Sequence, residues 1–187
     1  MNKKDATLTL TSLGWSIYTD DVGDKFAHYV LDDRIVQIIY GLDRIKDQQK
    51  FAAMLSMTTE TFSRAASKIS GDSSGFPLVR SWSNIDIRAP EILNEHIRQA
   101  SENAIAWALE QDLDKALKEY ALLPTDAPGA RPIWHLAALA LLGDVEKLKF
   151  YQASFEARDR LGFVPYVTKD HIDRAVAFAE KKALEER

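Results

Sequence analysis

The four histidines are the first residues that could do chemistry. They are His28, His96, His135 and His171, and no two of them lie three or four residues apart. That spacing would be needed for one helix face to present two ligands to a metal ion. The chain has no cysteine, so a thiolate nucleophile and a cysteine-ligated zinc are excluded as well. We therefore predict no metal site and no cofactor.

A possible serine nucleophile lies in the sequence Gly-Asp-Ser-Ser-Gly at residues 71–75, which matches the pattern G-x-S-x-G. In α/β-hydrolases a strand precedes this motif and a helix follows it, so that the turn exposes the serine. Here the order is reversed, because a predicted helix ends near Ile69 and extended chain begins at Phe76. We interpret the segment as a linker and expect no nucleophile at Ser73.

Phosphate-binding and acid–base motifs are also missing. The sequence has no G-x-G-x-x-G and no glycine-rich run that ends in Lys-Ser or Lys-Thr. The carboxylate pairs Asp20-Asp21 and Asp32-Asp33 lie in turn-like sequence, where aspartate is favoured. Two carboxylates can act as acid and base only if folding brings them together in a cleft. No residue is therefore predicted to be catalytic, and enzymatic activity stays an open question.

The segment 79–88 gives the strongest indication of a binding surface. As a single strand, its alternation would place Arg80, Trp82 and Arg88 on one face and apolar or small residues on the other. A tryptophan between two arginines is typical of an interface hot spot. The same tryptophan could instead pack beneath the arginine stems or under helices. We predict Arg80, Trp82 and Arg88 as binding residues.

Charge and hydropathy limit the classes of partner. The 24 basic and 28 acidic residues give a net charge of −4, without the basic surplus of a nucleic-acid-binding protein. The longest apolar run, residues 133–142 with His135 among them, is shorter than the roughly 20 residues of a membrane-spanning helix. We expect a cytoplasmic protein that binds neither nucleic acid nor membrane.

Composition changes near residue 90, where serine and threonine fall from 17 in residues 1–90 to four in residues 91–187. Serine and threonine are typical of strands, turns and caps, whereas the glutamate, alanine and leucine of the second part favour helices. We predict a strand-rich half (1–90) and a helical half (91–187) that share one core.

In the first half, residues 15–19, 26–31 and 34–42 are predicted strands, the last two forming a hairpin in which Tyr29 faces Val36. Residues 34–42 are apolar on both faces, which indicates a central strand covered on both sides. Residues 50–58 favour a strand and residues 62–69 a helix, while residues 6–13 fit either structure.

In the second half, helical periodicity covers residues 97–108 and 113–121. Pro132 begins a helix that is apolar nearly all round, Gly143 and Asp144 cap a tight turn, and the last helix begins at Thr168. The predicted fold is α+β: an antiparallel sheet of four to five strands with one or two helices, followed by about five packed C-terminal helices in hairpins.

A faint repeat relates residues 108–115 to residues 140–147, with four identities in eight positions at an offset of 32. It is similar to the stacked helical hairpins of tetratricopeptide-type repeats, which have a period of about 34. The aromatic and proline positions of that family are absent. The similarity fits common ancestry or two independent helix turns of the same chemistry.

These exclusions favour a non-catalytic protein-binding protein of bacterial type, similar in role to an immunity protein, a chaperone or an adaptor. The alternative is a hydrolase or a small-ligand binder with a cleft between sheet and helices. In that case His28, His96 or His135 would meet carboxylates there. We expect a protein partner, and the sequence predicts no oligomeric state.

Overall fold

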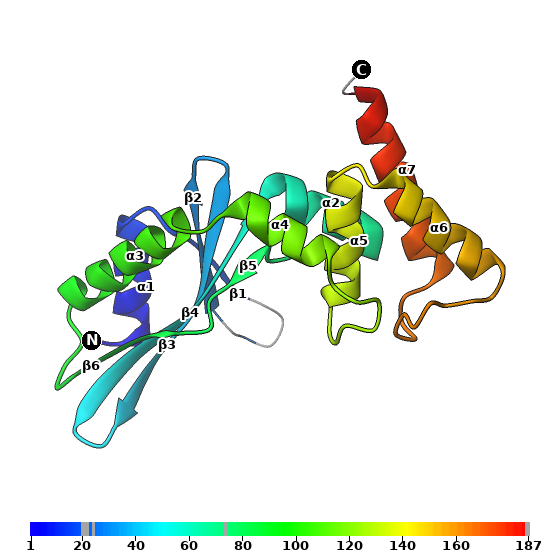
Figure 1. Ribbon diagram of the computed structural model, residues 1–187. Coiled ribbons are helices and arrows are strands. Elements are labelled where there is room, and N and C mark those ends of the chain that lie inside the picture. Colours follow the sequence, from blue (N-terminus) through cyan, green and yellow to red (C-terminus); the bar gives the residue numbers. More distant parts are fainter. Residues whose placement is uncertain (20–22, 24, 73–74, 186–187) are drawn as a thin grey trace. The chain divides into compact units, whose positions relative to one another are not determined.

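The computed structural model describes residues 1–19, 23, 25–72 and 75–185, and it shows an α+β protein with an antiparallel sheet followed by helices (Figure 1). The chain divides into two compact units. The sheet unit comprises Met1–Thr59 and Val79–Gln111, and the helical unit comprises Glu60–Leu78 and Asp112–Arg187. The predicted fold class is confirmed, whereas a shared core of the two halves stays a prediction.

The sheet is antiparallel and follows chain order over its first four strands. These are β1 (Ser16–Thr19), β2 (Lys25–Leu31), β3 (Arg34–Ile45) and β4 (Gln48–Thr59), and the short strands β5 (Val79–Arg80) and β6 (Ile85–Ala89) both pair with the far side of β4. The predicted hairpin is confirmed with its register, because Tyr29 lies opposite Val36. The strand predicted over residues 50–58 is also confirmed.

One face of the sheet is covered by α1 (Lys3–Ser12) and α3 (Asn94–Leu109) (Figure 1). The segment that fitted either structure is thus a helix, which begins with a capping box between Asn2 and Asp5. Trp15 is buried against α3 and its Nε1–H donates to Ser101 Oγ at 2.8 Å. From β3, Arg34 donates to the carbonyl of Ala108 in the last turn of α3, where a cation is favourable.

Two expectations about the sheet need correction. The strand β3 is central, but the helices of the sheet unit cover only one of its faces, and Ile39 on the other face is exposed. The single strand predicted over 79–88 is wrong, because β5 and β6 are separated by residues 81–84.

The reason for this break is a bulge at the edge of the sheet. Arg80 lies opposite Ser56 and Ile85 lies opposite Ala53, so four residues on this edge face only two on β4. The Ser81 N–H donates to the Leu55 carbonyl at 3.0 Å and holds the start of the bulge. Since the bulge adds an even number of residues, the predicted alternation of faces continues from β5 into β6.

The helical unit contains α2 (Glu60–Ser70), α4 (Leu113–Ala121), α5 (Arg131–Leu141), α6 (Val145–Glu156) and α7 (Lys169–Glu185). As predicted, α5 is the central helix. Every residue from Pro132 to Leu141 is buried, and α5 contacts the other four helices of the unit. The faint repeat corresponds to two equivalent N-caps, because Asp112 and Asp144 each accept from the backbone N–H three residues later, at 2.9 and 3.1 Å.

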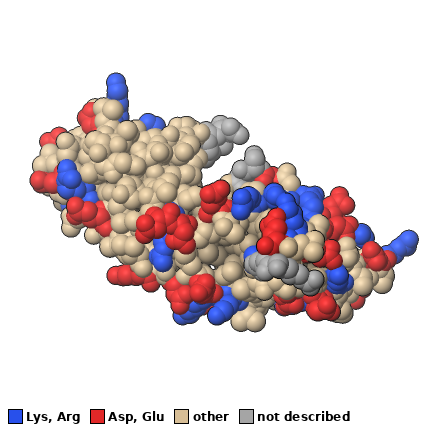
Figure 2. All heavy atoms as spheres, turned by 90° about the horizontal axis from the view of Figure 1, so that it is seen from above, with Lys and Arg blue, Asp and Glu red and all other residues tan. Residues whose placement is uncertain are grey.

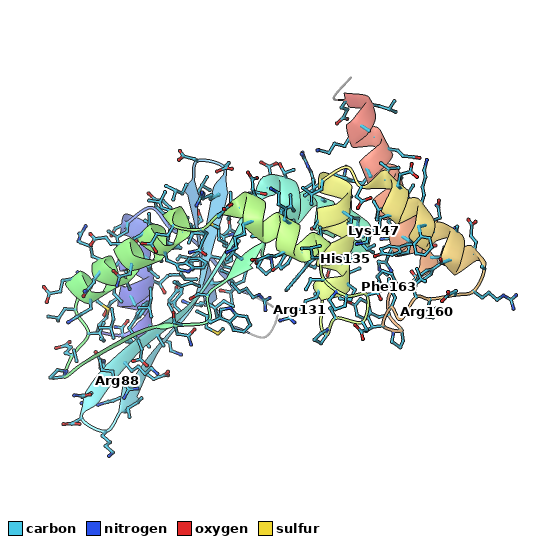
Figure 3. The ribbon with its side chains drawn as sticks, viewed as in Figure 1. Arg88, Arg131, His135, Lys147, Arg160 and Phe163 are labelled. Atoms are coloured by element: carbon cyan, nitrogen blue, oxygen red, sulfur yellow. The ribbon has the colours of Figure 1, made fainter. Side chains whose placement is uncertain are left out.

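The buried His135 joins α5 to two neighbouring helices (Figure 3). Its Nδ1 lies 3.0 Å from the Tyr120 carbonyl and its Nε2 lies 3.0 Å from the Tyr151 hydroxyl. A carbonyl only accepts, so Nδ1 carries the hydrogen and Nε2 accepts from Tyr151. Burial lowers the pKa of His135, and the ring is a neutral structural connection.

The C-terminus of α2 is held by α7. The Arg174 Nη1 donates to the Ile69 carbonyl at 3.0 Å, and Gly71 follows with a φ of +78°. A methyl group at Gly71 would overlap Arg174 Nη1, whereas one at Gly143, with a φ of +73°, would meet nothing within 4 Å. The two glycines therefore share a backbone conformation and differ in their surroundings.

We predict that Gly71→Ala destabilises the protein more than Gly143→Ala does. Both variants force alanine into the left-handed region at a cost of about 1 kcal/mol. Only Gly71→Ala also displaces Arg174 from a carbonyl, which adds about 1–2 kcal/mol. Urea unfolding followed by circular dichroism measures both losses, and equal losses would contradict the role of Arg174.

We also predict that stability falls as the pH falls below 6.5, the ordinary pKa of histidine, and that His135→Gln weakens this dependence. Burial is the largest cause that lowers the folded-state pKa of His28, His135 and His171. The unfolded chain therefore binds more protons in this range, and protonation favours unfolding. Unfolding free energies from pH 7 to pH 5 test this, and an unchanged slope in His135→Gln would refute the contribution of His135.

Candidate functional site

The candidate site is the face of the sheet opposite α1 and α3, which we call the open face. Within the sheet unit, no helix of the described residues lies on it. Its side chains follow from the strand register and stand in rows that cross the strands. Three of these rows matter here: an apolar row, a polar ladder and a charged row.

The apolar row crosses the whole sheet. Tyr18 on β1 pairs with Phe26 on β2, Phe26 pairs with Ile39 on β3, and Ile39 pairs with Met54 on β4. Tyr18, Ile39 and Met54 are 47%, 39% and 51% exposed. The row ends at the bulge opposite Met54, where Trp82 is 96% exposed. The apolar row of Tyr18, Phe26, Ile39 and Met54 is a continuous line of large side chains, and the exposed Trp82 belongs to the bulge at its end.

Aromatic packing orders the β1–β2 end of this row. The rings of Tyr18 and Phe26 stack at a centroid distance of 5.4 Å and an angle of 13°. The His28 ring lies against both, at 4.8 and 5.4 Å. This end of the open face is a set of mutually supported rings, whereas the other end presents the unbranched Met54 and the isolated Trp82.

The polar ladder runs beside the apolar row and consists of His28, Gln37, Ser56 and Arg80 in register. The Ser56 hydroxyl donates to Gln37 Oε1 at 2.9 Å, so the amide nitrogen of Gln37 faces His28 Nε2 at 3.0 Å. An amide N–H donates, and His28 Nε2 is therefore an unprotonated acceptor. Burial lowers the pKa of His28, and the ladder fixes its neutral form.

The charged row lies on the other side of the apolar row and consists of Lys50 and Arg88, which are cross-strand partners, and of Asp86, which lies opposite the small residue Ala52. Asp86 accepts from Lys50 at 2.7 Å and from Arg88 at 3.1 Å, and Figure 3 labels Arg88 on β6. The hydrogen bond from Arg88, followed by that from Lys50, lowers the pKa of Asp86, and Asp86 raises the pKa of Arg88. Arg88 therefore belongs to a small ion-pair network.

Few charged side chains stand on the open face. Figure 2 shows basic and acidic side chains next to one another on the visible face, without a continuous basic stripe. On the open face, the described charged side chains are Lys50, Arg80 and Arg88 against Asp43 and Asp86. All three basic groups lie on β4, β5 or β6. Arg80 lies next to the end of the apolar row, and Lys50 and Arg88 lie in the charged row.

The predicted binding residues thus come to one edge of the sheet. Arg80 and Arg88 lie on the open face on either side of the bulge that carries Trp82. Trp82 is 96% exposed, so within the sheet unit it packs neither beneath arginine stems nor beneath helices. The prediction missed Tyr18, Phe26, Ile39 and Met54. Their signal was the apolar second face of residues 34–42, which we attributed to burial.

Among the described residues, the histidines and carboxylates singled out from the sequence are not brought together in one site. His96 Nδ1 accepts from the Leu93 N–H and His171 Nδ1 accepts from the Thr168 N–H, so both histidines cap helices. In the described ranges, no group of three His, Asp or Glu side chains could hold a metal ion. Asp32 and Asp33 lie exposed in the β2–β3 turn, and Ser73, Asp20 and Asp21 lie outside the described residues.

A second candidate is an open pocket of about 610 Å³ between α1 and the start of α3. Leu8 and Leu93 form apolar walls, and Asp5, Glu91 and Glu95 supply carboxylates. Two of these carboxylates have partners within the chain: Asp5 accepts from the Asn2 N–H, and Glu91 pairs with the Met1 ammonium at 2.8 Å. These groups hold α1 in place, and the open face remains the better candidate.

We predict that Gln37→Glu raises the pKa of His28 above its ordinary value of 6.5. The new carboxylate would face His28 Nε2 in place of an amide N–H and would stabilise the imidazolium. An NMR titration of the His28 ring measures the change. Ser56→Ala is the control, because it frees the Gln37 amide to turn and should raise this pKa less. A His28 titration that Gln37→Glu leaves unchanged would contradict the ladder.

Comparisons with known proteins give a family and no function. Among the described residues, no helix is both long and apolar enough to cross a membrane. A search of curated proteins and a search of solved structures each found no match. A family model does match, over residues 2–180, and the chain accordingly belongs to DUF6990, which is described as a family of unknown function.

Proposed function

We propose that this chain is a non-catalytic protein-binding protein and that its partner binds the open face of the sheet. The observation that carries the proposal is the apolar row together with the bulge at its end, because Tyr18, Ile39 and Met54 in the row and Trp82 in the bulge are in contact with solvent. Exposing such a line of side chains is unfavourable in water. Large contiguous apolar patches on a folded protein are typical of interaction sites.

Residue types on the open face support a protein as the partner. Tyrosine, phenylalanine, tryptophan, methionine and arginine are enriched in protein interfaces, and the open face contains each of them. Glutamate and lysine are depleted in interfaces, and among the described residues this face has no glutamate and one lysine, Lys50. The two basic and one acidic side chains of the Lys50–Asp86–Arg88 network leave little charge for a phosphate backbone.

The alternative function, a hydrolase or small-ligand binder, has less support. It would need a histidine beside a carboxylate, but the hydrogen-bond partners of His28, His96 and His135 are an amide, a backbone group or a hydroxyl. A bacterial, cytoplasmic role as an immunity protein, chaperone or adaptor remains part of the proposal. It rests on composition and on the absence of catalytic motifs.

Photo-crosslinking tests the proposal in the cells that produce the protein. A benzophenone amino acid at position 54 should crosslink to one protein, and the same amino acid at Leu122, which is 80% exposed in the helical unit, should not. The crosslinked protein must then bind the purified chain. Equal crosslinking from both positions, or a captured protein that does not bind when purified, would overturn the proposal.

For the purified complex, we predict that Trp82→Ala weakens binding by about 2 kcal/mol, or roughly 30-fold, as truncation of a hot spot does. Thermal stability should change little, because the exposed side chain loses few contacts within the chain. Leu122→Ala is the matched control and should change neither property. Calorimetric titration and thermal melting measure the two effects. A large loss of stability in Trp82→Ala would contradict its exposure.

A further inference from the structure

We infer that the segment bound on the open face is an amphipathic α-helix of another protein, with acidic residues in its last turn. This inference rests on the proposed function and adds the shape and charge of the partner. Three features of the open face carry it: the spacing within the apolar row, the small residues beside that row, and the one-sided position of the basic groups.

The spacing of the apolar row fits a helix better than an extended strand. Neighbouring members of the row stand on neighbouring strands, roughly 4.8 Å apart. Side chains three or four residues apart on a helix are about 5–6 Å apart, whereas same-side residues of a strand are roughly 6.7 Å apart. From β1 to the β5–β6 edge the row spans roughly 19 Å, which is the length of about 13 helical residues.

Small residues beside the row leave room for a helix. Gly41 and Ala52 are cross-strand partners and separate Ile39 and Met54 from Asp43 and Lys50, while Asp86 on β6 lies opposite Ala52. A methyl group at Gly41 would meet only the Asp43 carboxylate, at 3.7 Å, so the space above this backbone is open. A helix about 10 Å wide that contacts Ile39 and Met54 would pack on the surface above Gly41 and Ala52. The polar ladder would border it on the other side.

The basic groups give the bound helix a direction. Arg80 lies beside the end of the row marked by Trp82, because it is opposite Ser56, whereas Lys50 and Arg88 belong to the charged row and already pair with Asp86. The Tyr18 end carries no basic side chain on the open face among the described residues. A helix C-terminus carries partial negative charge, and acidic residues in the last turn add to it. We therefore place the C-terminal end of the partner helix beside Arg80 and Trp82.

Binding of an extended strand at the β6 edge is the less favoured mode. Its backbone would have to pair along an edge that the 81–84 bulge interrupts, that Asp86 and Arg88 make charged, and that Pro90 ends. Bulges, charges and prolines at sheet edges oppose pairing with a further strand. The open face, rather than the edge, is where the partner gains contact area.

The test uses a display library of random 16-residue peptides, from which peptides that bind the full chain are selected. Peptides that also bind the Met54→Asp variant are removed. We expect enriched peptides with apolar residues at i, i+4, i+7 and i+11 and with Asp or Glu in the last turn. Circular dichroism of a peptide and chain mixture should show added helix. The tryptophan fluorescence of the chain should shift to shorter wavelength as the Trp82 ring leaves water, and this shift should be absent in Trp82→Phe.

Two variants report on the individual features. Arg80→Glu should weaken an enriched peptide at least tenfold and should favour a version with Lys in its last turn. Ala52→Phe should fill the space beside Met54 and reduce helix binding by a similar factor. Leu122→Asp, in the helical unit, is the matched control and should have no effect. Thermal melting of each variant shows that it is folded.

Any of four results would overturn the inference. Two concern the enriched peptides: apolar residues that alternate at i and i+2, or an affinity that Arg80→Glu leaves unchanged. The other two are a selection in which no peptide depends on Met54, and sedimentation experiments in which the chain self-associates through position 54. If crosslinking from position 54 still identifies a partner, but the bound segment of that partner is not a helix, the proposed function stands and only the inference of a bound helix is wrong.

Discussion

The pairing of β3 with β4 is the constraint on which the rest of the sheet unit depends. Twelve residue pairs join these strands, from Arg34–Thr59 at one end to Ile45–Gln48 at the other. This register decides at once which side chains meet α1 and α3 and which stand on the open face. A slip of β3 by one residue would send Val36 and Ile38 into water and Ile39 into the core. The apolar row therefore exists only because the long hairpin is in this register.

Much of this arrangement could be predicted from the sequence, because local chemistry determines it. The turn at Asp32-Asp33 fixed the β2–β3 register, and the apolar periodicity of residues 113–121 and 133–141 gave α4 and α5. Asp112 and Asp144 cap helices because a carboxylate after a helix end accepts the free N–H groups of the next helix. These are interactions between residues close in the chain, and they do not require knowledge of the tertiary fold.

The candidate site could be predicted only in part, for a physical reason. The apolar second face of β3 fits burial and exposure equally well. The type of a side chain indicates whether its burial is favourable, but it does not show whether another element covers that face. Trp82 was identified from composition. Its companions Tyr18, Phe26 and Met54 join it only through pairings between distant segments. The bulge at 81–84 was missed because an even insertion preserves the alternation from Val79 to Arg88, so the sequence still looks like one strand.

The same bulge connects edge protection with binding. A sheet edge with free N–H and C=O groups invites pairing with other chains, and a two-residue insertion with charged neighbours prevents continuous pairing. Looping out four residues also removes Trp82 from the pleated surface, so that its ring is held by few intramolecular contacts. A tryptophan in that position costs little folding stability when it is replaced, yet it offers the largest apolar side chain to a partner. Edge protection alone would be served by a lysine or a proline. We attribute the tryptophan at this position to the proposed contact with a partner.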